Sequence, residues 1–125
     1  MNIRLPDDML ASVASAAEER GQDTNALVTE MVGETLKRWQ VPGITFVDGP
    51  AGRRARIEGT GIDVFEIVQA FLAEGRDRVQ LAAAYHWLDD GQLDAALTYF
   101  RAFPEDVTPY LDIVDDRDTA HRLGE

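Results

Sequence analysis

The first forty residues predict one short strand and two amphipathic helices, with no second strand nearby to pair with the first. The strand covers residues 2–5 and ends at Pro6, which cannot donate to a ladder but fits the first turn of a helix. The helices are expected over residues 6–20 and 24–40. A lone strand leaves backbone N–H and C=O groups unpaired, and a helical hairpin of this size buries little apolar surface. We therefore expect a second copy of the chain to complete this segment.

An apolar pattern with helical spacing runs along both expected helices. It comprises Leu10, Val13, Ala14 and Ala17 in the first helix, and Leu27, Val28, Met31, Val32, Leu36 and Trp39 in the second. Two copies could pair residues 2–5 into an antiparallel ribbon and interlock these helical faces beneath it. This arrangement is the ribbon-helix-helix homodimer, whose ribbon can enter the DNA major groove.

The DNA-binding candidates of such a dimer are Asn2, Arg4, Thr24 and Asn25. Strand alternation puts Asn2 and Arg4 on the outer face, where Asn can bind adenine and Arg can bind guanine. Thr24 and Asn25 open the second helix, where backbone amides and the helix dipole favour a DNA phosphate. Asp23 would cap the same helix well, but its carboxylate would repel a phosphate. The alternative is that Asn2 and Arg4 are soluble edge residues without a DNA role.

Composition excludes several classes of protein. The 125 residues include no cysteine, so the chain forms neither disulfides nor thiolate metal sites. No apolar run has membrane-spanning length and the start of the chain lacks the apolar core of a signal peptide, so we expect a cytoplasmic protein without a membrane partner. His86 and His121 are isolated and no phosphate-binding glycine motif occurs, so we expect neither an enzyme nor a bound metal or cofactor. The net charge of −11 argues against nucleic-acid binding over the whole surface, since phosphate neutralisation requires Lys and Arg.

Residues 41–103 predict a second domain, which begins where Pro42 and Gly43 break the preceding helix. Its expected elements are strands over residues 44–47 and 55–58, then helices over residues 64–73, 78–85 and 90–102. The last two helices have the spacing of a helix-turn-helix. The fold class is therefore mainly α with short strands, in which a ribbon-helix-helix dimer of residues 1–40 precedes a small β-hairpin and three-helix domain.

Charges in this second domain have two interpretations. Arg53, Arg54 and Arg56 form the densest basic cluster. Solubilising charge on an exposed edge strand is the simpler interpretation, and a contact to phosphate or to an acidic partner is the alternative. The last helix begins with acidic residues, which suit a DNA groove poorly. We expect it to serve as a core and as a dimer or partner surface, with Tyr99, Phe100 and Phe103 as candidate contact aromatics.

A family resemblance lies in the same domain. The run GRRARIEGTGIDV at residues 52–64 resembles the Gly-x-Pro-x-Ile-x-Gly-Thr-Arg-Ile-x-Val start of the family called domain of unknown function 433. The family's later pieces also occur in order, as Ala73-Glu74-Gly75 and as the helix from Leu93 to Tyr99. Two positions depart from the family pattern, because an arginine stands where the family has its Pro after the first Gly, and Gly61 replaces the family's Arg. The resemblance implies an antitoxin of a type II toxin–antitoxin pair, encoded beside a small PIN-like ribonuclease.

Residues 104–125 form the most acidic segment, with seven acidic residues against two basic ones. An inhibitor of a PIN-like ribonuclease can offer a cation to the enzyme's metal-binding carboxylates, or cover its basic RNA path with acidic groups. Tyr110, Leu111, Ile113 and Val114 are candidate apolar anchors for the toxin, and Arg117 or Arg122 could enter the carboxylate cluster. The alternatives are a solvated tail, or a last helix packed on its own domain.

The leading hypothesis is an antitoxin that dimerises through its N-terminal ribbon, represses its own operon, and neutralises a PIN-like ribonuclease through residues 41–125. A second hypothesis is a stand-alone dimeric ribbon-helix-helix transcriptional regulator with another partner. A third is an interaction module without a DNA role. The identity of the neighbouring reading frame distinguishes the first two hypotheses.

Overall fold

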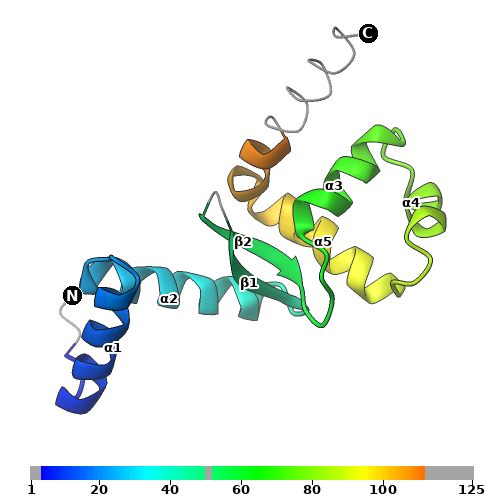
Figure 1. The fold of residues 1–125 in the computed structure, drawn as a ribbon. Helices are drawn as coiled ribbons and strands as arrows, with labels where there is room; N and C mark the ends of the chain where they lie inside the picture. Colours follow the sequence, from blue (N-terminus) through cyan, green and yellow to red (C-terminus); the bar gives the residue numbers. More distant parts are fainter. Residues whose placement is uncertain (1–3, 50–51, 112–125) are drawn as a thin grey trace, which may run out of the picture. The chain divides into compact units, whose positions relative to one another are not determined.

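The computed structural model describes residues 4–49 and 52–111, and these residues are mainly helical with one antiparallel β hairpin (Figure 1). This confirms the expected class of mainly α with short strands. The chain divides into two compact units, residues 1–40 (unit 1) and residues 41–125 (unit 2). Across the described residues, no helix combines the length and the apolar character needed to cross a membrane.

Unit 1 is a pair of helices, α1 (Asp7–Glu19) and α2 (Thr24–Gln40), whose bounds are close to those expected. Asp7 and Asp8 place negative charge in the first turn of α1, where the helix dipole favours it. The helix ends at Glu19, and Gly21 two residues later has a φ of +64°, a conformation that favours a residue without a Cβ. The Asp23 carboxylate then accepts the backbone N–H groups of Asn25 and Ala26 and so begins α2.

The predicted N-terminal strand has no counterpart in the described part of the single chain. Arg4 and Leu5 have no regular secondary structure, while Asn2 and Ile3 lie outside the described residues. A ribbon of the kind expected pairs strands from two chains, so its formation stays a prediction.

Unit 2 begins with the hairpin of β1 (Ile44–Gly49) and β2 (Gly52–Ile57), paired from Ile44 opposite Ile57 to Gly49 opposite Gly52. The paired segments reach further toward the turn than predicted, because Asp48 pairs with Arg53 and Val47 with Arg54 in the same ladder. Ile44 and Ile57 lie on the buried face, where alternation along the strands places them.

Three helices follow the hairpin: α3 (Val64–Ala73), α4 (Arg78–Ala84) and α5 (Asp90–Ala102), of which α3 and α5 pack against it. An aspartate precedes each helix as its N-cap. Helix α3 packs against both α4 and α5, and α5 also contacts both strands. The most deeply buried side chains of this core are Ile44, Ile57, Val64, Ile67, Val68, Leu81, Leu93 and Tyr99. Tyr99 therefore packs in the core, and its expected role as a partner contact is wrong.

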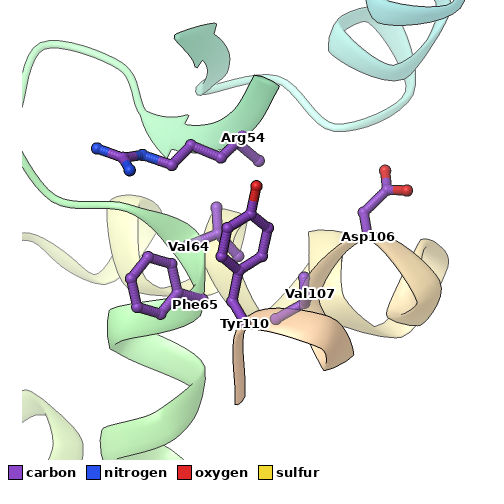
Figure 2. A pocket seen from close by; sticks show the side chains of 7 residues that line it. Arg54, Val64, Phe65, Asp106, Val107 and Tyr110 are labelled. Atoms are coloured by element: carbon purple, nitrogen blue, oxygen red, sulfur yellow. The ribbon is translucent and has the colours of Figure 1, made fainter. Parts of the chain in front are cut away.

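The structure differs from the expected boundary after Phe103. Residues 104–111 are helical, and Val107 and Leu111 are buried in the core of unit 2. The Tyr110 ring stacks on Phe65 of α3 with centroids 5.3 Å apart, and its hydroxyl donates to the Arg53 carbonyl at 3.3 Å (Figure 2). These residues pack on their own domain because Val107 and Leu111, four residues apart, lie on one helical face. A separate tail therefore does not begin at Pro104.

Candidate functional site

The main candidate surface consists of exposed apolar side chains on both helices of unit 1. Its six large side chains are 45–75% exposed: Met9 and Leu10 of α1, and Met31, Val32, Leu36 and Trp39 of α2. We call these six residues the apolar face. Trp39, the largest of them, is also the most exposed at 75%. Large apolar side chains gathered on one unit in this way mark an interaction surface.

The packing inside unit 1 explains why this face is left open. Ala17 and Leu27 are the buried residues of α1 and α2, so the contact between the two helices is small. Fully burying a large apolar side chain contributes roughly 1.5–3 kcal/mol, and each residue of the apolar face retains about half of its surface or more in water. Burial of the apolar face against another surface would therefore contribute free energy to an association.

The structure places the described DNA-binding candidates at the start of each helix. Arg4 is exposed just before α1, and Thr24 and Asn25 form the first turn of α2. The Asp23 Oδ2 atom lies 3.1 Å from the Asn25 nitrogen and 3.3 Å from the Ala26 nitrogen. The amides expected to receive a DNA phosphate are thus already occupied by a carboxylate of the same chain.

Replacing Asp23 by asparagine should strengthen DNA binding. Asparagine caps a helix about as well as aspartate, so α2 should keep its stability, while a negative charge beside the phosphate path is removed. We expect a roughly threefold to tenfold gain in affinity for a DNA fragment carrying the promoter upstream of the gene, measured by fluorescence anisotropy. The Asp8→Asn variant serves as a control, since Asp8 caps no amide of α2. Equal affinity of Asp23→Asn and the unmodified protein would show that no phosphate approaches this turn.

The basic cluster of unit 2 has internal partners. The Arg54 and Arg56 Nε atoms lie 2.8 Å and 2.9 Å from the two carboxylate oxygens of Asp63, which is 4% exposed. Arg53 pairs with Asp48 at 3.2 Å. Two of the three arginines thus bind the N-cap residue of α3 to strand β2. Sequence reasoning missed this role of Asp63, although an aspartate just before an apolar helix is a recognisable capping signal.

The proposed toxin anchors fall into two groups. Tyr110 is half-buried and Leu111 is only 8% exposed, so Leu111 is not accessible to a partner in this fold. Ile113, Val114, Arg117 and Arg122 lie outside the described residues. The small cavity beside Tyr110, seen in Figure 2, has a volume of about 10 Å³ and so holds at most one water molecule. It is too small for a ligand.

Unit 2 also exposes two large apolar side chains, Val79 in the first turn of α4 and Trp87 in the connection between α4 and α5. Val79 is 76% exposed and Trp87 is 60% exposed. The Trp87 ring lies 5.3 Å from Tyr85 and 5.2 Å from His86, measured between ring centroids. Burial, and secondarily the negative charge of Glu66, raises the pKa of Tyr85, so its phenol stays neutral at physiological pH.

The candidate surfaces of the described residues are therefore the apolar face and the patch around Trp87. No protein family, characterised protein or solved structure matches the chain in sequence or fold comparisons. Within residues 4–49 and 52–111, no group of three or more His, Cys, Asp or Glu side chains is placed to hold a metal ion. Both candidate surfaces are suited to binding macromolecules, because each is open and presents aromatic and aliphatic side chains.

Proposed function

We propose that the protein is a homodimeric antitoxin. Unit 1 forms the dimer and positions paired N-terminal strands on operator DNA, and unit 2, residues 41–125, binds and neutralises a PIN-like ribonuclease. The observation that carries the proposal is the apolar face, which the described part of unit 1 leaves exposed. A helix pair preceded by a segment whose described residues, Arg4 and Leu5, pair with no strand is what a ribbon-helix-helix protomer requires.

A second copy is the occupant that best fits the apolar face. A two-fold contact places the same residues of both copies against each other, so an apolar face on one copy meets an apolar face on the other. Met9 and Leu10 lie near the start of α1, and so close in sequence to the segment expected to form the ribbon. Dimerisation through this face would therefore also bring the two N-terminal segments together.

Arg4 should be the main DNA contact among the described residues, because it is exposed and precedes α1 directly. We expect Arg4→Ala to lower operator affinity at least tenfold, since loss of one bidentate arginine–guanine contact in each copy costs about 1–3 kcal/mol. An electrophoretic shift assay with the promoter fragment measures the loss, and light scattering verifies that the dimer persists. If Arg4→Ala binds the fragment as tightly as the unmodified protein, the ribbon is not the DNA-binding element.

The ribonuclease partner is supported by the resemblance of residues 52–64 and the following helices to an antitoxin family, and by the net charge of −11. The test is to co-express the chain with the product of the adjacent reading frame, purify the pair, and measure ribonuclease activity with and without the chain. We expect a stable complex and a loss of activity. A neighbour that neither copurifies nor loses activity would exclude the antitoxin and favour the stand-alone regulator.

A further inference from the structure

The end of unit 2 formed by α4 and the start of α5 combines exposed apolar side chains with an acidic rim. Val79 and Trp87 are the apolar members, and Asp89, Asp90 and Asp94 form the rim. We call these five residues the α4–α5 end. Val79 also lines an open groove together with Arg78, Ala82, Asp90 and Asp94. Trp87 lies two residues before Asp89 along the chain, and an exposed aromatic side chain close to charged residues is common in protein interfaces.

The net charge of this region determines which kinds of binding partner are favoured. Residues 77–94 include four aspartates and a single arginine, Arg78. The Arg78 Nη2 atom lies 3.2 Å from both Asp90 Oδ1 and Asp94 Oδ1, so this cation is already neutralised by the rim. The region therefore presents a net negative charge, and its one arginine is held inside the cluster.

Three occupants are disfavoured by that charge. Nucleic-acid phosphates and an anionic membrane surface would be repelled, although α4 and α5 occupy the places of a helix-turn-helix in the sequence. A second copy is also disfavoured, because a two-fold contact would bring the aspartates of one copy against those of the other. The binding partner whose charge complements this acidic region is therefore a protein with a basic surface. That surface would also need an apolar recess to accept Trp87.

Trp87 is free to act as an anchor because the core of unit 2 does not require its full side chain. Its ring is 60% exposed and contacts Tyr85 and His86 at the surface. The neighbouring Leu88 is the residue that enters the core at this position. Substitution of Trp87 should therefore change the surface while leaving the fold in place.

The α4–α5 end lies at the opposite end of α5 from residues 104–111 (Figure 1). Helix α5 has 13 residues, which corresponds to a length of about 20 Å. A partner that binds the chain after Leu111 and also reaches the α4–α5 end must therefore span the length of this helix.

We propose that the α4–α5 end is a docking surface for the basic, RNA-binding face of the ribonuclease, with Trp87 as its anchor and the aspartates facing the enzyme's cations. This inference rests on the proposed function, and it adds a defined surface of unit 2 to the contacts offered by the residues after Leu111. Occupation of the RNA path by an acidic surface would exclude RNA by competition, without any contact to the catalytic carboxylates.

The test uses the full chain and the purified product of the adjacent reading frame, with affinity measured by calorimetry. We expect Trp87→Ala to raise the Kd at least tenfold, as for a central aromatic anchor, and Trp87→Phe to retain most of the affinity. We expect Asp90→Asn to slow association and to weaken its dependence on salt, because rim charges act mainly on the association rate. The matched control is Glu105→Gln, which removes an exposed acidic group near the far end of α5.

The outcomes separate this inference from the proposed function. If the unmodified chain does not bind the ribonuclease, the proposed function is wrong and the docking surface is excluded with it. If the unmodified chain binds and Trp87→Ala binds equally tightly, the proposed antitoxin function stands. Only the proposal that the α4–α5 end is a docking surface is then excluded. Circular dichroism of each variant verifies the fold. A Trp87→Ala variant that has lost its helical signal would be replaced by Val79→Ser, for which the same two outcomes apply.

Discussion

Substitution of Leu36 by glutamate should convert the protein from a dimer into a monomer. Leu36 lies in the centre of the exposed stripe of α2, between Val32 and Trp39, and is 55% exposed in the single chain. In the proposed dimer a carboxylate at this position would be removed from water without a partner, which costs several kcal/mol for each copy. We expect the dissociation constant of the dimer to rise at least about a hundredfold, as measured by light scattering across a dilution series.

The same substitution should have two further effects. Because the contact between α1 and α2 is small, unit 1 should lose helical signal when its partner leaves. Operator binding should be lost as well, since a ribbon requires two strands. Thr29→Glu is the matched control, because it places the same carboxylate on the exposed polar face of α2. A Leu36→Glu protein that remains dimeric would place the dimer contact elsewhere and remove the main support for the proposed function.

The second large effect is expected in unit 2, where Asp63→Ala should destabilise the fold by about 3 kcal/mol. The carboxylate is buried, pairs with Arg54 and Arg56, and stands at the N-terminus of α3. Its removal leaves two partly buried guanidinium groups without their shared partner and also removes a helix cap. A loss of this size is a large fraction of the total stability of a small domain.

Urea denaturation measures this loss most directly. The chain has two tryptophans, Trp39 in unit 1 and Trp87 in unit 2, so a Trp39→Phe background makes the fluorescence signal specific to unit 2. The control is Asp48→Ala, which removes the 63%-exposed partner of Arg53 and should cost less than about 1 kcal/mol. Equal midpoints for the two variants would mean that the Asp63 cluster does not hold β2 to α3.

Local signals in the sequence were sufficient to locate the helices and the hairpin. Helix α2 has the predicted bounds because Asp23 caps its start and Pro42 follows closely after its end. Helices α3 and α5 likewise begin after an aspartate and carry apolar residues at helical spacing. These signals act within a few residues of the chain, so they can be recognised without knowledge of the rest of the fold.

The candidate sites could be predicted from the sequence to different degrees. The apolar stripe of α2 was predicted, and four of its residues are exposed as an unpartnered face requires. The patch around Trp87 was not predicted, because the pattern of residues 78–88 does not indicate which of its apolar side chains the core accepts. The pairing of Arg54 and Arg56 with Asp63 was also missed. No regular spacing along the sequence indicates it, because the contact forms only when the hairpin packs against the start of α3.

The sequence by itself determined the class of fold and most helix bounds, because these follow from short-range periodicity and capping. It also predicts that residues 1–40 need a partner. Only the tertiary structure decided that residues 104–111 belong to unit 2, that Leu111 is buried, and that the arginines of β2 hold α3 in place. These contacts join residues that are distant along the chain. Val107 and Leu111 could have served equally well in a partner's groove, and their burial was decided by the space that α3, α5 and the hairpin leave between them.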